Sequence, residues 1–329
     1  IKVNLNDTEF LDFCFVNDKL HLYNESGSGG FIDSVLERGN ISYFETSRGC
    51  CRECDFCTER LTGRSEMSSE SFFSRIDSYM KNRISTILFC DDNLLQRVNK
   101  GPQAYEELIL MFDYLRHHQL IWEFPVGLEI GKLFNTRTAG VKDSLIESLF
   151  WNNDSLDNFS GAFRALIPVE NSLSGNKDHR LSKLRKFDEN VAILEQIISS
   201  GVPQINLGVM IGWPEESHDS IKNITEKLEL IDQLCVSVNN KNIHNIKTKI
   251  NYSIFCVTPL PGTPFYNNMH DRGKIKFDIE QDPELWNLNT SVLEGNHFSP
   301  SEIGFIRDDM LSRFNSKHID GKIPLKLNF

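Results

Sequence analysis

Short apolar runs alternate with longer helical patterns from Ile41 onward, and this alternation predicts an α/β fold around a parallel sheet. The alternation occurs six times, which is too few units to close an eight-stranded barrel. The sequence therefore predicts an open, curved partial (β/α)6 TIM-like barrel. A flat, doubly wound sheet is the alternative that the pattern leaves open.

The expected strands are short runs of mostly branched and aromatic residues, at residues 41–46, 85–90, 121–124, 162–169, 205–211 and 249–257. The segments between them carry apolar residues at helical spacing on one face, as helices packed against a sheet do. Gly201 follows one of these segments, in the position that glycine favours after a helix. The expected helices are at residues 69–80, 103–118, 140–151, 187–200 and 221–234.

The chain of 329 residues is long enough for one large domain with additions or for two domains. We expect residues 1–40 to form a short β-rich lead-in, residues 41–266 to form the barrel core and residues 267–329 to form a C-terminal helical extension. One helix is expected in the extension. It should start at Ser299, because the Ser-Pro-Ser-Glu segment combines a capping serine, a first-turn proline and a returning glutamate.

The composition excludes several classes of protein. With 40% hydrophobic and 25% charged residues, the chain has the balance of a globular protein and differs from disordered or collagenous sequences. A net charge of −11 provides no broad basic surface, so we expect no nucleic-acid partner. The longest apolar run, residues 108–112, is far shorter than the ~20 residues of a membrane span. No basic-then-apolar leader opens the chain, so we expect a cytoplasmic protein without a membrane association.

Four of the eight cysteines lie within residues 50–57. Cys50, Cys54 and Cys57 have the spacing C-x3-C-x2-C, whereas Cys51 in place of Cys50 would give C-x2-C-x2-C. Thiolates this close in one loop indicate a single metal centre, with zinc or an iron–sulfur cluster as candidates. A structural zinc site usually takes four ligands in two separated pairs, and no second pair follows in the sequence. Three ligands imply an open coordination position.

The C-x3-C-x2-C spacing, with Phe56 before the last cysteine and in a loop after the first expected strand, resembles the radical S-adenosylmethionine (SAM) superfamily. The resemblance covers residues 41–266. Three further segments, FCDDN at 89–93, GVMIGWPEE at 208–216 and TPLPGTP at 258–264, are similar to the branch whose members often carry an upstream cobalamin-binding domain. All four segments lie at the ends of expected strands, where the working groups of such barrels are found.

This resemblance implies that Cys50, Cys54 and Cys57 bind a 4Fe–4S cluster and that Cys51 is a bystander. In the family, the amino and carboxylate groups of SAM chelate the remaining iron. An electron from the cluster then cleaves the C5′–S bond, and the resulting 5′-deoxyadenosyl radical abstracts hydrogen from the substrate. We therefore expect an enzyme with a small organic, biosynthetic substrate and an external electron donor of the flavodoxin or ferredoxin type.

The resemblance also suggests SAM contacts at the strand ends. Asp91, Asp92 and Asn93 follow the second strand, where the family binds the SAM ammonium group; a turn or helix cap is the alternative role. Arg164 would pair either with the SAM carboxylate or with an acidic residue in the core. Glu170 would contact the ribose or the methionyl part, or would be a solvated loop carboxylate.

The remaining candidate contacts are Phe56 in the cysteine loop, Ile211 and Gly212 beside the adenine, and Thr258 on the adenine side or in a rigid turn. Glu129 should point toward the same end of the barrel, without an assigned role. The other cysteines at strand ends or in apolar patterns, Cys90, Cys235 and Cys256, are expected to be buried small hydrophobic residues.

Several alternatives stay open. Cobalamin is possible but not expected. Only 49 residues precede Cys50, and none shows the D-x-H-x-x-G signature of a cobalamin domain, so either that domain lies upstream of Ile1 or the protein works without cobalamin; we favour the second alternative. The alternatives are a cobalamin-dependent C-methyltransferase, cleavage of another S–C bond of SAM for aminocarboxypropyl transfer, or a non-catalytic metal-binding module. A modifier of RNA or protein is disfavoured by the negative charge.

Overall fold

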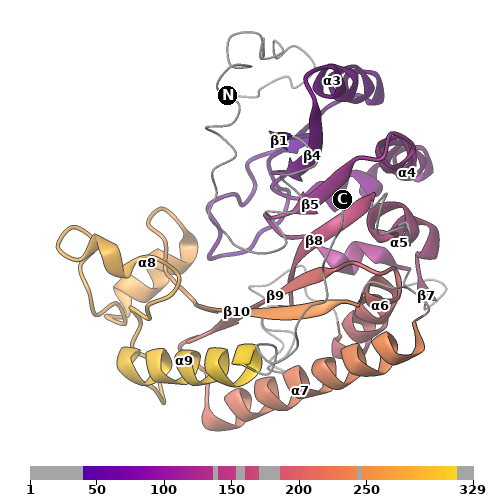
Figure 1. The fold of residues 1–329 in the computed structure, drawn as a ribbon. Helices are drawn as coiled ribbons and strands as arrows, with labels where there is room; N and C mark the ends of the chain where they lie inside the picture. Colours follow the sequence, from indigo (N-terminus) through magenta and orange to yellow (C-terminus); the bar gives the residue numbers. More distant parts are fainter. Residues whose placement is uncertain (1–39, 136–139, 153–159, 170–185, 243–246, 317–329) are drawn as a thin grey trace.

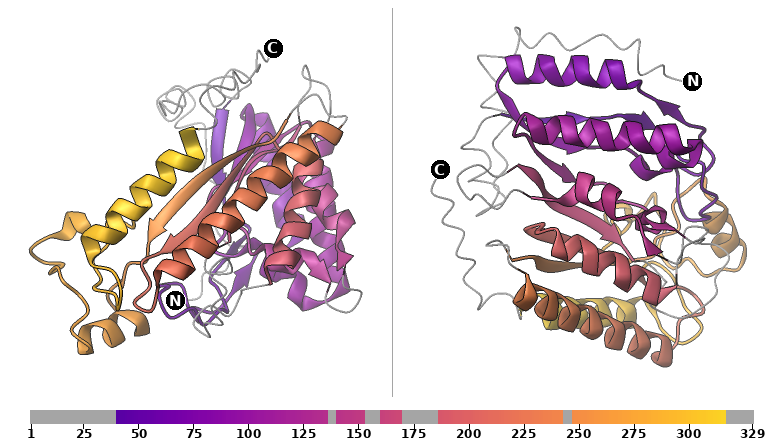
Figure 2. Two further views of the ribbon diagram at one scale, coloured as in Figure 1. Left: turned by 90° about the horizontal axis from the view of Figure 1, so that it is seen from below. Right: turned by 90° about the vertical axis from the view of Figure 1, so that its right-hand side faces the viewer.

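The computed structural model describes residues 40–135, 140–152, 160–169, 186–242 and 247–316 (Figure 1). At its centre is a six-stranded sheet with the strand order β1-β4-β5-β8-β9-β10, in which all neighbouring strands are parallel. The strands follow the order of the chain without the reversal that defines a doubly wound sheet. Helices α3 to α7 lie together on one side of this sheet (Figure 2). The structure thus confirms an α/β fold of the partial-barrel type.

All six expected strands are present, within two residues of their expected bounds. They are β1 (Asn40–Phe44), β4 (Ile84–Phe89), β5 (Ile121–Phe124), β8 (Gly161–Pro168), β9 (Gln204–Ile211) and β10 (Lys249–Cys256). In β10 every second side chain is buried and the others are half-buried, as expected for a strand with one face under helices.

The five expected helices are α3 (Ser69–Lys81), α4 (Pro102–His117), α5 (Asp143–Phe150), α6 (Phe187–Ser199) and α7 (His218–Lys241). Serine caps start two of them: Ser68 accepts a hydrogen bond from the Ser71 amide, and Ser217 forms a capping box with Ser220. Helix α5 starts later than expected, because Gly140–Val141 forms the short strand β7 and pairs with β6 (Phe134–Asn135).

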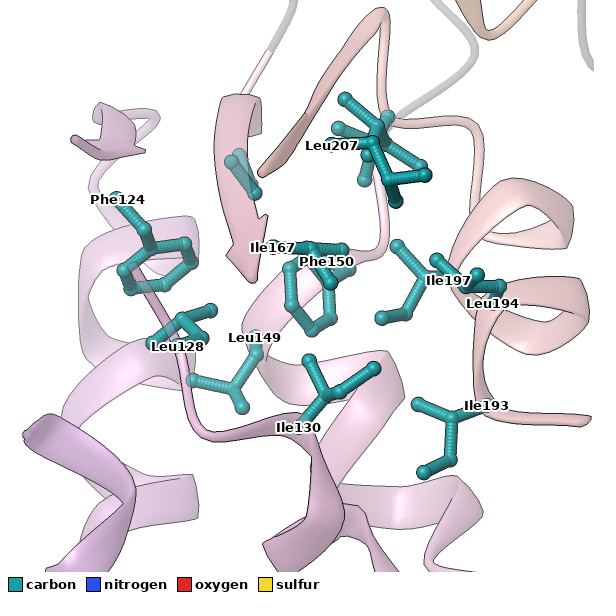
Figure 3. Close-up of a cluster of buried hydrophobic side chains, with 14 of the residues drawn as sticks. Phe124, Leu128, Ile130, Leu149, Phe150, Ile167, Ile193, Leu194, Ile197 and Leu207 are labelled. Atoms are coloured by element: carbon teal, nitrogen blue, oxygen red, sulfur yellow. The ribbon is translucent and has the colours of Figure 1, made fainter. Parts of the chain in front are cut away.

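The main core lies between the sheet and these helices. Figure 3 shows the part between β5, β8 and β9 and the helices α5 and α6, where fully or almost fully buried aliphatic and aromatic side chains interdigitate. Removing each such side chain from water contributes about 1.5–3 kcal/mol. A second, smaller cluster lies beyond the ends of β9 and β10 and contains Trp213, Val257, Phe265, Met269, Val292 and Leu293.

The C-terminal part contains more structure than the sequence predicted. Helix α9 (Pro300–Ser316) starts as expected, with the Ser299 amide donating to the Glu302 carboxylate at 2.7 Å. Asn315 near its end donates to and accepts from the backbone of Tyr252, which ties α9 to β10 (Figure 1). Helix α8 (Pro264–Asp271) was not expected. It starts at Thr263, whose hydroxyl oxygen accepts from the Tyr266 amide.

Four short elements were also not expected: β2 (Ser47–Arg48) and β3 (Ser65–Glu66), which pair with each other, and the 3₁₀ turns η3 (Leu94–Lys100) and η4 (Ile130–Leu133). Three of them lie beside the cysteine segment. In the ranges that the structure describes, no helix is both long and apolar enough to cross a membrane.

Candidate functional site

The cysteine segment forms a loop at the edge of the sheet where the strands end. Strand β2 leads into the loop and β3 follows it, so their pairing closes the loop at its base. Gly49 has φ +89°, and a Cβ atom there would lie 1.8 Å from the carbonyl oxygen of Gly63. Only glycine permits this close crossing of the two ends of the loop.

Two predicted site residues anchor the start of this loop. The Asp91 carboxylate is fully buried and accepts hydrogen bonds from the Thr46 and Ser47 hydroxyls, both at 2.5 Å, and from the Thr46 amide at 3.2 Å. Asp92 accepts from the Gly49 amide at 2.6 Å. Burial raises the pKa of Asp91, although these hydrogen bonds act in the opposite direction. Both carboxylates therefore connect the end of β4 to the loop.

The adjacent cysteines differ in their surroundings. The Cys50 sulfur accepts a hydrogen bond from Gln96 Nε2 at 3.3 Å and lies 3.8 Å from Asn93 Nδ2. The Cys51 side chain is exposed, while its backbone amide donates to Gln96 Oε1 at 3.1 Å. Cys54 is buried. Amide donors stabilise a thiolate and tune the potential of an iron–sulfur cluster.

The donor set suits a cluster better than a single ion. Among the residues with described positions, no three His, Cys, Asp or Glu side chains are arranged around one metal ion. A cubane cluster does not require that arrangement, because each thiolate binds a different iron atom. The side chains of Cys50, Cys54 and Cys57 come from one loop, and cysteine sulfur is the soft ligand type that iron–sulfur clusters need.

Three segments meet at Glu129, which lies in the loop after β5. Its buried carboxylate accepts from Nε of Arg52 at 3.2 Å and also from Nη2, and from Asn93 Nδ2 at 2.7 Å. Although burial acts to lower it, the hydrogen bond and charge of Glu129 raise the pKa of Arg52. The other amide atom of Asn93, Oδ1, is buried and accepts no hydrogen bond from the residues in the described ranges.

The end of β9 forms a second part of the site. Ile211 is buried, and Gly212 has φ +86° and donates its amide to Glu216 at 2.5 Å. The Trp213 amide donates to the same oxygen at 3.3 Å. Burial raises the pKa of Glu216 to about 7, even though the two amide donors act to lower it. Glu216 was not among the predicted site residues, although it belongs to the quoted GWPEE segment.

Aromatic packing joins the cysteine loop to the β9 end. The Phe56 ring packs edge-on against Trp213, with 5.7 Å between the ring centroids, and Trp213 packs against Phe265 of α8 at 5.5 Å. The Phe265 amide donates to the Asp55 carbonyl at 3.1 Å. Thr258 is buried in the same region and donates its hydroxyl to the Cys256 carbonyl. Helix α8 and the small apolar cluster thus hold the far end of the loop.

Two other candidates have different surroundings. Arg164 forms a two-point ion pair with Glu123, at 2.6 and 2.9 Å, so of its two expected partners the structure contains the acidic core residue. Glu170 lies outside the described residues.

Cys235 and Cys256 are buried as expected, and burial raises the pKa of their thiols to about 12 and about 11, respectively. Cys90 is only half-buried, which differs from the expectation.

The structure therefore brings Asp91, Asp92 and Asn93 to the cysteine loop, and it brings Phe56 to the β9 end. Sequence reasoning missed Arg52 and Gln96, and it left Glu129 without a role. The position of Arg52 between two cysteines was the available signal. For Gln96 the sequence contained none beyond its closeness to Asn93.

Comparison with solved structures identifies the fold. The chain matches the radical SAM methyltransferase TsrM from Kitasatospora setae, solved with cobalamin and a 4Fe–4S cluster, with a TM-score of 0.50 and 13% identity over 75% of this chain and 43% of TsrM. TsrM with tryptophan substrate and the SAM analogue aza-SAM gives a TM-score of 0.50 and 13% identity over 74% of this chain and 41% of TsrM. SuiB from Streptococcus suis, bound to SAM, gives a TM-score of 0.42 and 8% identity over 87% of this chain and 51% of SuiB.

The matched part of this chain covers less than half the length of TsrM. No protein-family model matches the sequence, and no curated protein matches it either. At such low identity the likeness shows the fold alone. That fold is the one found in radical SAM enzymes, as the cysteine spacing predicted.

Proposed function

We propose that this chain is a radical SAM enzyme in which Cys50, Cys54 and Cys57 hold a 4Fe–4S cluster. The observation that carries the proposal is the environment of Cys50, whose sulfur accepts a hydrogen bond from Gln96 and lies beside the Asn93 amide, at the end of β4. Donors to sulfur at this position support the C-x3-C-x2-C register. The exposed side chain of Cys51 supports its role as a bystander.

The bound cluster and SAM would supply one-electron reductive cleavage of the C5′–S bond, and through it hydrogen abstraction from a small organic substrate. The chain's own residues hold and orient these groups. Gln96 and Asn93 direct N–H groups at the Cys50 sulfur, and the Asp91 and Asp92 carboxylates hold the start of the loop. Phe56 packs on Trp213 and holds the far end of the loop.

We place the SAM ammonium group at Asn93. The Asp91 oxygens already accept three hydrogen bonds, and Asp92 accepts one from Gly49. The buried Asn93 Oδ1 has an unused acceptor position, and leaving such a group unsatisfied costs about 1–3 kcal/mol. An ammonium donor would satisfy it. Ile211, Gly212 and Thr258 remain the candidate adenine contacts, while the ion pair of Arg164 with Glu123 supports a structural role for that arginine.

Further parts of the proposal concern the electron donor, the location in the cell and cobalamin. The chemistry requires an external one-electron donor of the flavodoxin or ferredoxin type, and we propose a cytoplasmic enzyme that acts without cobalamin. The electron donor is proposed from the superfamily resemblance. The cobalamin-free assignment is proposed because the sequence contains no D-x-H-x-x-G signature, even though the resemblance is to the cobalamin-associated branch.

The test is anaerobic reconstitution with iron and sulfide, followed by SAM and dithionite. We expect a cluster and the product 5′-deoxyadenosine. Methylthioadenosine would indicate cleavage of the other S–C bond, and S-adenosylhomocysteine would indicate methyl transfer; either would overturn the proposed reaction. A protein that binds no cluster would overturn the proposal itself. Stoichiometric cobalt retained after addition of hydroxocobalamin, with activity that depends on it, would overturn the cobalamin-free assignment.

Alanine variants test the ligand register in the same preparation. The broad absorbance at about 400 nm, where iron–sulfur charge transfer lies, should be lost in Cys50→Ala, Cys54→Ala and Cys57→Ala. Cys51→Ala is the matched control and should keep it. Loss of the cluster in Cys51→Ala together with its retention in Cys50→Ala would show that the C-x2-C-x2-C register is used instead.

A further inference from the structure

We infer that Glu129 is a positioning residue that holds the cysteine loop and Asn93 in one arrangement, and thereby sets both SAM affinity and the potential of the cluster. The inference rests on the proposed function and deepens it. Glu129 itself needs no contact with SAM. It acts through Arg52, from the cysteine loop, and through Asn93, from the segment after β4.

The geometry is that of a rigid three-way contact. The Glu129 carboxylate is buried, and two nitrogen atoms of one Arg52 guanidinium donate to its two oxygens. Such two-point pairs fix orientation as well as distance. Lys132 lies farther away, with its Nζ 3.9 Å from the carboxylate, and adds charge compensation. The Arg52–Glu129 ion pair thus holds the middle of the cysteine loop against the loop after β5. Gln96 provides a separate contact, because its side chain hydrogen-bonds to Cys50 and Cys51.

Glu129 also decides which atom of the Asn93 amide is available. An ionised carboxylate can only accept hydrogen bonds, so Asn93 must turn its Nδ2 group toward it. The flipped amide would place Oδ1 against a negatively charged oxygen. The Nδ2–Glu129 distance of 2.7 Å therefore fixes Oδ1 as the unused buried atom, and that atom is an acceptor. The negative charge of Glu129 makes the Asn93 site selective for a donor such as an ammonium group.

The same pair acts on the cluster electrostatically. Arg52 lies in the cysteine loop, two residues from both Cys50 and Cys54, so its guanidinium places a positive charge in the loop that would hold the cluster. The Glu129 carboxylate, which is hydrogen-bonded to this guanidinium, partly neutralises that charge. Adding an electron to the cluster increases its negative charge, so a nearby positive charge favours reduction and a negative one opposes it. Removing the charge of Glu129 should raise the reduction potential, and removing that of Arg52 should lower it. A purely structural ion pair would not produce shifts of opposite sign.

The experiment compares Glu129→Gln with Glu229→Gln, which breaks the ion pair of Glu229 with Arg313 between α7 and α9. Three quantities are measured: the rate of alkylation of Cys50 and Cys54 in the apoprotein by mass spectrometry, the SAM affinity of the reconstituted protein by equilibrium dialysis, and the midpoint potential by a redox titration followed by electron paramagnetic resonance. For Glu129→Gln we expect faster alkylation, SAM affinity lower by about 10–100-fold, as is typical for residues that orient ligands, and a more positive potential. Glu229→Gln should change none of them.

Arg52→Met provides the second variant, because it breaks the same pair from the partly exposed side and should be better tolerated by the fold. It should also speed alkylation, but it should make the potential more negative. Wild-type alkylation and SAM affinity in both variants would overturn the inference, as would potential shifts of the same sign. If the wild-type protein binds no cluster, the proposed function fails. Faster alkylation in the variants would then show that the contact of Glu129 holds the cysteine loop even though the proposed function is wrong.

Discussion

The buried carboxylate of Asp91 provides the sharpest test of how the site is held together. Its Oδ1 atom accepts from two hydroxyls and its Oδ2 atom from the Thr46 amide. In Asp91→Asn, one of these positions becomes an NH₂ group that faces a donor. Each hydrogen bond to an ionised acceptor contributes about 1.5–3 kcal/mol, and a buried unsatisfied donor costs a similar amount. We therefore expect the free energy of unfolding to fall by about 2–4 kcal/mol.

Asp92→Asn is the matched control. Within the part of the chain that the structure describes, the Asp92 carboxylate accepts a hydrogen bond from the Gly49 amide alone, and an asparagine can present its Oδ1 atom in the same place. We expect a loss of less than about 1 kcal/mol. The assay is anaerobic urea unfolding of the apoprotein followed by circular dichroism, with cluster content measured after reconstitution. Equal stability of the two variants would refute this reasoning. Normal stability and cluster content in Asp91→Asn with weakened SAM binding would instead support a direct contact between Asp91 and SAM.

Two further predictions concern the loop crossing and the β9 end. Gly49→Ala should displace the loop, because its Cβ would lie 1.8 Å from the Gly63 oxygen; we expect loss of cluster binding, and normal iron content would contradict this. Burial raises the pKa of Glu216 from 4.5 to about 7, so the folded state holds this proton more tightly than the unfolded chain does. The resulting stability is fully present below pH 4.5 and is lost as the pH rises through 7, a change of about 3 kcal/mol. Denaturant unfolding across this range should show the decline in the wild type and a flatter profile in Glu216→Gln; parallel profiles would refute the assignment.

Local sequence patterns were sufficient to predict the strands of the main sheet and the fold class. All six strands of the sheet and the start of α9 lie where apolar periodicity and the Ser299 capping pattern placed them. These features depend on short-range preferences, which are expressed in the sequence within a few residues. The spacing of the cysteines is likewise a local property, and it predicted the fold that the structural comparison found.

Local patterns did not predict two elements, the helix α8 and the short strand β7, because the local sequence permits more than one conformation there. No helix was predicted at Pro264, but Thr263 caps the segment and Phe265 packs against Trp213, so that it forms α8. Gly140 looked like the start of a helix, but pairing with β6 draws it into a strand. In both cases a tertiary contact decided between two conformations that the local sequence permits.

The partners of the charged groups were decided only by the tertiary structure. Arg52, Asn93 and Glu129 lie far apart in the sequence, yet one carboxylate binds the other two side chains because three strand ends meet at one edge of the sheet. The sequence allowed Arg164 two partners, and the register of β5 against β8 places it beside Glu123. Ion pairs and buried hydrogen bonds depend on register and loop conformation, which form only when the whole sheet assembles. The sequence alone therefore predicted the fold and the chemistry proposed for the cysteine loop, and the tertiary structure decided which side chains surround that loop.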